Sequence, residues 1–227
     1  MGVMYIGSMD TLISPESVIA GDVLLCFDKV LASKAKEETG SNYSHSAICI
    51  RQNEIAESDH AGVKKSCLLE FASDHDAIAI LRPHPGCWTP DRVEKLNTFI
   101  DAAILRKAKF NIEGFQNFES TVQNHKENIF IKLEKYFAGD LLPNNPEKPE
   151  YFCSELVVAC FYYCQILTDS AAIYYQPDAH RTGKLSKDPT FGLFVGHLEV
   201  YDGFEVPKED EFLTTGRYHD VYPENET

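Results

Sequence analysis

The chain changes from an extended segment to a helix within Pro149-Glu150-Tyr151-Phe152-Cys153-Ser154-Glu155-Leu156-Val157-Val158-Ala159-Cys160-Phe161. The aromatic pair before Cys153 favours an extended backbone, and the apolar run after Glu155 predicts a buried helix over residues 153–167. Cys153 thus occupies the expected first helical turn. Free backbone N–H groups and the positive end of the helix dipole favour a thiolate there and can hydrogen-bond a developing oxyanion. A structural cysteine in a buried helix is the alternative interpretation.

A candidate base for this thiol lies far upstream. The run Tyr43-Ser44-His45-Ser46-Ala47-Ile48-Cys49-Ile50 is predicted to be a strand with His45 near its start, and another strand is expected over about 54–58. If the two strands pair as a hairpin, Glu57 can accept the imidazole N–H of His45 and stabilise the imidazolium. His45 would then serve Cys153 as a general base. The alternatives to Glu57 are Asp59, which is the closest, Glu54 and Glu70.

The N-terminal half has the pattern of an antiparallel meander. Short apolar or alternating segments at 23–27, 43–50, 54–58 and 77–82 are predicted strands, with 62–65 and 67–71 between them. Residues 28–42 are polar and end in the turn Gly40-Ser41-Asn42. Several short strands in sequence order predict one sheet in this half.

The C-terminal half is predicted to be mainly helical. Thr89 is a good N-cap for a helix that ends near 106–107. A second helix is predicted over 119–137 and stops at Gly139, and two weak strands are expected at 191–195 and 197–200. At 227 residues the chain suits a single domain over 1–227, of class α+β.

Composition and charge restrict the partners. A formal net charge of −14 and a pI of about 4.9 argue against nucleic acid and anionic membrane surfaces, which attract basic patches. Seven cysteines with no C-x-x-C pair are typical of free thiols in a reducing compartment. Met1–Ser8 lacks the pattern of a secretion signal and no run is long enough to span a membrane, so a cytoplasmic location is expected. Secretion without a cleaved signal would leave no such mark.

The sequence predicts no metal site and no cofactor. Besides His45, the histidines are spread along the chain without ligand spacing: His60, His75, His84, His125, His180 and His197. Cys26, Cys49 and Cys160 lie inside apolar runs and are expected in the core. The aromatic residues Tyr43, Tyr151 and Phe152 are candidates for a substrate pocket, although aromatic residues are more often ordinary core.

Four short motifs occur in an order that resembles the permuted NlpC-type papain-like cysteine amidases and peptidases, the YiiX-like group. They are Gly21-Asp22-Val23-Leu24, Tyr43-Ser44-His45-Ser46-Ala47-Ile48, Ala56-Glu57-Ser58 with Gly62-Val63, and Tyr151-Phe152-Cys153-Ser154-Glu155-Leu156-Val157. In this permuted group the histidine strand precedes the cysteine helix. No single motif is specific; their order is what carries the resemblance, over about residues 21–160.

The resemblance implies a circularly permuted papain-like fold, in which an antiparallel sheet or small barrel packs against helices. It implies a cysteine hydrolase with Cys153 as nucleophile, His45 as base and Glu57 as the residue that orients the histidine. The backbone N–H of Cys153 would help to hold the oxyanion. Asp22, Ser154 and Glu155 match motif positions where a structural role is expected. Residues 110–149 are longer and more helical than the family pattern and are interpreted as an insertion.

Several alternatives for substrate and function stay open at this stage. The expected substrates are a small peptide or isopeptide amide, an acylated amine or a lipid-like molecule. A lipid acyltransferase or thioesterase of the related permuted class is the next hypothesis, although that class carries Asn before its cysteine and this chain has Phe152. A non-catalytic binding module on the same fold is a third. The sequence makes no prediction of the oligomeric state.

Overall fold

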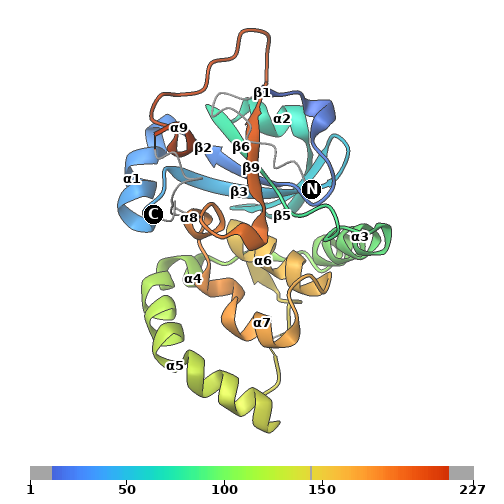
Figure 1. Cartoon of the computed structure of the whole chain (residues 1–227), viewed down its shortest axis with the longest axis vertical. Helices are drawn as coiled ribbons and strands as arrows, with labels where there is room; N and C mark the ends of the chain where they lie inside the picture. Colours follow the sequence, from blue (N-terminus) through green and yellow to red (C-terminus); the bar gives the residue numbers. More distant parts are fainter. Residues whose placement is uncertain (1–11, 144, 215–227) are drawn as a thin grey trace, which may run out of the picture.

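The computed structural model describes residues 12–143 and 145–214, which form a mixed α+β structure (Figure 1). The predicted class, with a mostly antiparallel sheet packed against helices, is confirmed. The strands are β1 Leu12–Ile13, β2 Val23–Phe27, β3 Tyr43–Arg51, β4 Glu54–Asp59, β5 Gly62–Cys67, β6 Ala77–Arg82, β7 Lys109–Phe110, β8 Glu150–Tyr151 and β9 Leu193–Leu198.

The helices lie between and after these strands. The α-helices are α1 Lys29–Thr39, α2 Leu68–Ser73, α3 Pro90–Leu105, α4 Ile112–Gln116, α5 Phe118–Ala138, α6 Cys153–Tyr163, α7 Asp169–Tyr174, α8 Thr182–Leu185 and α9 Glu211–Thr214. Three short 3₁₀ helices complete the order: η1 Pro15–Ser17, η2 Pro177–Ala179 and η3 Pro189–Phe191.

One seven-stranded sheet organises the structure. Its strand order is β1-β9-β6-β2-β3-β4-β5, and every neighbouring pair is antiparallel except β1 and β9. β2, β3, β4 and β5 are neighbours in chain order, as the sequence predicts: two-residue turns connect β3 to β4 and β4 to β5, whereas α1 lies between β2 and β3. A second, two-stranded parallel pairing joins β7 to β8. It therefore ties the start of the 110–149 segment to the residues just before Cys153.

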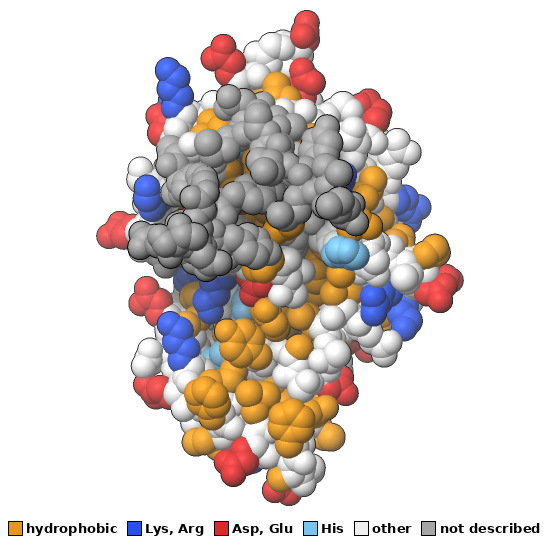
Figure 2. Space-filling view, viewed as in Figure 1, with side chains coloured by type: hydrophobic (Ala, Val, Ile, Leu, Met, Phe, Trp, Pro, Cys, Tyr) orange, Lys and Arg blue, Asp and Glu red, His pale blue; other side chains and the backbone are white. Residues whose placement is uncertain are grey.

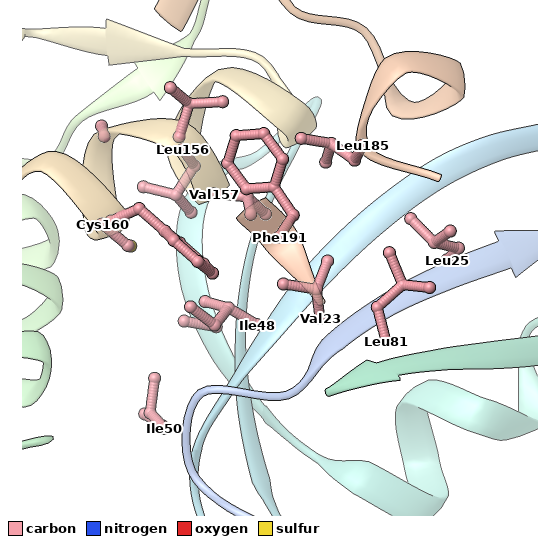
Figure 3. Packing of buried hydrophobic residues seen from close by; sticks show 14 of the residues in the cluster. Val23, Leu25, Ile48, Ile50, Leu81, Leu156, Val157, Cys160, Leu185 and Phe191 are labelled. Carbon is pink, nitrogen blue, oxygen red and sulfur yellow. The ribbon is translucent and has the colours of Figure 1, made fainter. Parts of the chain in front are cut away.

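Both faces of the main sheet are covered. Val23, Leu25 and Ile48 point to one face, where they pack with Leu156 and Val157 of α6 (Figure 3). The residues between them on the same strands point to the other face and pack around α2; they include Leu24, Cys26, Ala47 and Cys49. Because side chains alternate along a strand, two-sided burial requires continuous apolar runs, and β2 is buried at all five positions.

A tight turn at Gly21 and Asp22 leads into β2. Gly21 has φ +92°, and a Cβ at this position would lie 2.2 Å from the Trp88 ring, so both conformation and space require glycine. The Asp22 carboxylate accepts two hydrogen bonds from Arg82, of 2.9 and 2.7 Å, and one of 3.0 Å from the Ile19 N–H. The Gly-Asp motif thus anchors β2 to β6, which is a structural role.

The structure differs from the sequence-based expectations in its smaller helices. Residues 29–39, expected to be a polar connection, form α1. Within residues 29–37, the part of α1 whose side chains are described, Ala32 and Ala35 are the buried residues, so the apolar stripe is too narrow to be recognised as a helical period. Gly40, with φ +70°, ends the helix. Residues 68–73 form α2 rather than a strand, and the two weak C-terminal strands are one, β9.

The helix predictions at the centre of the chain are close to the structure. The N-cap at Thr89 is confirmed, since its side chain accepts from the Arg92 N–H, and α5 ends at Gly139 as expected. α6 begins at Cys153 as predicted but ends at Tyr163, before the expected 167. The prediction about Met1–Ser8 lies outside the described residues.

The predicted insertion begins within β7, which lies beside β4 and β5, and it contains α4 and α5; α5 extends below α6, away from the sheet (Figure 1). Hydrophobic side chains gather on this lower part of the molecule, over α5 and α7 (Figure 2). Phe130, Phe137 and Tyr174 are more than half exposed. One side of α5 therefore packs against the rest of the molecule, and its other side leaves large apolar side chains exposed.

The Gly-Asp turn leads to a stability prediction. Asp22→Asn removes a buried carboxylate from Arg82, and we expect a loss of about 2 to 3 kcal/mol in the free energy of unfolding, moderated because Arg82 is partly exposed. Urea denaturation followed by circular dichroism measures the change.

Glu147→Gln is the matched control for this variant. It breaks a similar Arg–carboxylate contact, to Arg106 at 2.8 Å, but both partners are exposed, and such pairs contribute about 0–1 kcal/mol. Equal losses in the two variants would contradict the anchoring role of Asp22.

Candidate active site

Cys153 is the first residue of α6, and the helix start is held from several sides. The Phe152 N–H donates to Glu155 Oε2 at 3.2 Å, so Glu155 caps the first turn. The Ser154 hydroxyl donates to the His180 carbonyl at 2.7 Å. Cys153 is only 6% exposed. The position of Cys153 is thus fixed by the next two residues, Ser154 and Glu155, whose side chains hydrogen-bond around the first helical turn.

Glu155 also connects the helix start to the 110–149 segment. Its buried carboxylate accepts from Lys148 Nζ at 2.7 Å and from Asn111 Nδ2 at 3.0 Å. Burial raises the pKa of Glu155, and the Lys148 charge and these hydrogen bonds oppose that rise. Asn111 and Lys148 lie at the two ends of the segment, so both of its ends are attached to the helix that carries Cys153.

His45 and Glu57 lie on the paired strands β3 and β4. Ala47 is opposite Glu57 in the ladder, so His45, two residues earlier, is its diagonal neighbour on the same face. His45 Nε2 lies 2.8 Å from Glu57 Oε2. This bond uses Nε2 and leaves Nδ1 as the ring nitrogen available to Cys153.

The alternative carboxylate, Asp59, is occupied elsewhere. It pairs with Lys64 Nζ at 2.8 Å and accepts from the Ala61 N–H at 2.8 Å. Glu57 is the partner of His45, and its second oxygen accepts from the Ser66 hydroxyl at 3.1 Å. Burial raises the pKa of Glu57, but the His45 hydrogen bond and charge, together with Lys64, hold that pKa below its usual value. Glu57 is therefore a carboxylate that can stabilise an imidazolium.

The electrostatics of the site favour a thiolate on Cys153. Burial raises the pKa of this thiol, but the hydrogen bond to His45 and the imidazolium charge outweigh it and lower the pKa to about 7. For His45 the directions are reversed: burial lowers the pKa of the imidazole, whereas the hydrogen bonds and charges of Cys153 and Glu57 raise that pKa to about 10. These opposite shifts favour the thiolate and imidazolium forms of the pair, which is the arrangement of an activated nucleophile.

Four other buried cysteines behave in the opposite way. Burial raises the pKa of Cys49 and Cys164 to about 12, and it raises the pKa of Cys26 and Cys160 well above the usual value. These thiols pack as small core residues, as the sequence predicts for Cys26, Cys49 and Cys160. The lowered pKa of Cys153 thus reflects its partners and not burial as such.

Two hydroxyl groups complete the surroundings of the sulfur. Thr182 Oγ1 lies 3.8 Å from Cys153 Sγ, and Ser46 provides a further contact; both lower the thiol pKa. Ser46 Oγ is buried and makes no closer hydrogen bond within residues 12–143 and 145–214. Thr182 was not found from the sequence, because α8 is one short turn in a segment without periodicity.

A second histidine lies against the ring of His45. The His75 ring stacks on it with centroids 5.8 Å apart, and Phe71 packs against both rings. His75 Nδ1 lies 2.8 Å from Asp28 Oδ1, and the Ser44 hydroxyl donates to the other oxygen of Asp28. This stack restricts the orientation of the His45 ring. The sequence offers no signal for it, since His75 comes 30 residues after His45.

Cys153 opens into a cleft with a cavity volume of about 170 Å³. The cleft lies between α1, the start of β3, α4 and α8, and it is lined by Leu31, Lys34, Ala35, Tyr43, Ser44, Phe115, Phe152, Cys153, Ser154, Arg181 and Thr182. Of the aromatic residues named from the sequence, Tyr43 and Phe152 line it. Tyr151 does not; it is fully buried and packs against Phe99. A small organic group can thus approach the sulfur.

Comparison with known proteins leaves the site to be interpreted from its geometry. No model of a known protein family matches the chain, and a search of curated proteins finds no match. Among residues 12–143 and 145–214, no group of three or more His, Cys, Asp and Glu side chains is arranged to hold a metal ion. None of the helices in the described ranges is long and apolar enough to cross a membrane.

The pKa of Cys153 leads to a prediction about alkylation. We expect iodoacetamide to react with Cys153 faster than with the other six cysteines, with a rate that rises with pH through about 7 as the thiolate forms. Peptide mapping by mass spectrometry across pH 5–9 measures this profile. If the fast reaction persists in Cys153→Ala, another cysteine is responsible and the prediction is wrong.

The carboxylate pair Glu57 and Asp59 allows a matched test. Glu57→Gln removes the charge that favours the imidazolium, so we expect the pKa of Cys153 to rise and its alkylation at pH 7 to fall about tenfold. Asp59→Asn removes the same charge two residues away, where the contact is to Lys64, and should leave the alkylation rate nearly unchanged. The reverse result would identify Asp59 as the functional carboxylate.

Proposed function

We propose that the protein is a cysteine hydrolase that cleaves an amide bond through Cys153, His45 and Glu57. One observation carries the proposal: a thiol with lowered pKa opens into a cleft and is paired with a histidine whose far nitrogen is held by a buried carboxylate. A purely structural ion pair would also shift these pKa values. A cysteine that served only core packing, however, would need neither the histidine partner nor the cleft beside it.

The reaction follows from the positions of these groups. The Cys153 thiolate attacks the carbonyl carbon, and the electron pair of the C=O bond moves to the oxygen. The backbone N–H of Cys153, at the start of α6, donates to that oxyanion. When the carbonyl re-forms, the C–N bond breaks, and the His45 imidazolium gives its proton to the departing amine. A thioester on Cys153 remains.

Release of the acyl group reverses the role of His45. The imidazole, now neutral, takes a proton from water while the water oxygen attacks the thioester carbonyl. The C–S bond breaks, the acid leaves, and the proton on His45 restores the ion pair with the thiolate. Glu57 keeps its hydrogen bond to Nε2 throughout and stabilises the positive charge whenever the ring carries it.

The arrangement supports the proposal of a permuted papain-like fold. The histidine strand β3 comes before the cysteine helix α6 in the chain, and α6 packs on β3 and β4. A lipid-like acyl substrate is the second candidate, because Leu31, Phe115 and Phe152 give the cleft apolar walls. The same Cys153 chemistry would serve an amide, an ester or a thioester.

The decisive test is to trap the acyl-enzyme. Incubation with activated acyl amides and esters should add the mass of the acyl group to the peptide that contains Cys153, and neutral hydroxylamine, which cleaves thioesters, should remove it. Cys153→Ser should lose the adduct and at least about 10³-fold of the hydrolysis rate. Hydrolysis that continues at the wild-type rate in Cys153→Ala would refute the proposal.

A further inference from the structure

The Thr182 hydroxyl lies where the Cys153 sulfur meets the cleft. Thr182 Oγ1 is 3.8 Å from Cys153 Sγ, and both residues line the cleft. Thr182 is only 4% exposed, so its hydroxyl acts in surroundings where a hydrogen bond is stronger than in water. A carbonyl group that reaches the sulfur through the cleft therefore lies beside this hydroxyl.

Hydrogen bonds hold the segment that carries Thr182. The Ser154 hydroxyl donates to the His180 carbonyl at 2.7 Å, which attaches the segment to the first turn of α6. Lys184 Nζ donates to the Ala179 carbonyl at 2.7 Å and so closes the segment on itself. Burial lowers the pKa of His180 to about 4, so its ring is neutral at neutral pH and packs as an uncharged group. Thr182 is thus fixed relative to Cys153 before a substrate binds.

A tetrahedral intermediate on Cys153 would have its oxyanion within reach of Thr182. The oxygen is bonded to the carbon that Sγ attacks, so it lies about 3 Å from the sulfur. A donor to an oxyanion lies about 2.7–3.1 Å from that oxygen. The distance of 3.8 Å between Oγ1 and Sγ is compatible with both values, so an oxygen atom in the cleft can accept from the hydroxyl while its carbon is bonded to the sulfur.

We propose that Thr182 is a further catalytic residue, whose hydroxyl donates to the oxyanion together with the backbone N–H of Cys153. This inference rests on the proposed function and adds a second donor to its reaction. As the C–S bond forms, the electron pair of the C=O bond moves to the oxygen, and the hydroxyl turns from the sulfur to that oxygen. The hydroxyl keeps its own proton throughout, and the contact weakens again when the carbonyl re-forms and the leaving group departs.

The hydroxyl interacts more strongly with an oxyanion than with the sulfur. Its contact with Sγ is long, at 3.8 Å, whereas an O–H···O⁻ hydrogen bond is about 2.5–2.7 Å and is among the strongest in proteins. Only an interaction that becomes stronger in the transition state accelerates the chemical step. The Thr182 hydroxyl meets this requirement, and removal of one such donor lowers kcat by about 10²–10³-fold.

Two reactions of Cys153 separate oxyanion stabilisation from thiolate stabilisation. p-Nitrophenyl butyrate acylates the thiolate through an oxyanion and releases nitrophenolate. Iodoacetamide alkylates the thiolate by displacing iodide from a saturated carbon, and no oxyanion forms. Each rate is measured on the plateau of its own pH profile, so a shift in the pKa of the thiol does not contribute. In Thr182→Val, which removes the hydroxyl with little change of shape, we expect acylation to fall about 100-fold and alkylation to stay nearly unchanged.

Two further variants complete the experiment. Thr182→Ser keeps the hydroxyl and should retain most of the acylation rate. Ser46→Ala is the matched control, because Ser46 also contacts the sulfur and lowers the pKa of the thiol but is not among the described residues that line the cleft. Its two plateau rates should change by the same factor. Circular dichroism establishes that each variant is folded, and Thr182→Ala carries the same prediction if Thr182→Val is not.

The outcomes separate this proposal from the proposed function. Acylation that stays at the wild-type rate in Thr182→Val, or that falls by the same factor as alkylation, overturns the role of Thr182 and leaves Cys153 as the nucleophile. A wild-type protein in which iodoacetamide alkylates Cys153 but the ester does not acylate it contradicts the proposed function, and this proposal with it. A selective loss of acylation that Thr182→Ser restores supports the hydroxyl as the oxyanion donor.

Discussion

The candidate active site depends on the packing of α6 across β3 and β4. Cys153 and His45 are 108 residues apart in the chain, yet the helix places the thiol where the imidazole can reach it. The helix side that makes this contact is strongly apolar, and Leu156, Val157 and Phe161 are fully buried. Burial of that surface supplies the free energy that holds two polar groups together away from water.

Burial alone would disfavour a thiolate at Cys153. It raises the pKa of each of the four core thiols Cys26, Cys49, Cys160 and Cys164. At Cys153 the imidazolium reverses this effect, and the imidazolium exists because Glu57 and the thiolate together outweigh its own cost of burial. Cys153, His45 and Glu57 thus form a series in which neighbouring opposite charges favour each other's charged forms. Ser66 and Lys64 end the series, where it reaches the exposed edge of the sheet.

The 110–149 segment is joined to this centre and is not a peripheral addition. β7 pairs with β8 just before Cys153, Asn111 and Lys148 both bind Glu155, and Phe115 and Phe118 pack against the Arg181 guanidinium. The segment that binds the start of α6 therefore also lines the cleft, through Phe115. A segment attached in this way can change the shape of the cleft without moving Cys153 relative to His45.

The sequence by itself determined the elements with a strong local signal. The meander strands, the Thr89 N-cap, the end of α5 at Gly139 and the start of α6 at Cys153 all follow from alternation, capping residues or apolar runs. It also named His45, Glu57 and Cys153 as residues to be brought together, but left Asp59 as a rival. Only the tertiary structure decided between the two carboxylates, because strand register and the position of Lys64 set their contacts. It likewise placed Thr182, His75 and Arg181 around the candidate site. They lie in short or irregular elements and reach the site through contacts between distant segments, for which no local pattern exists.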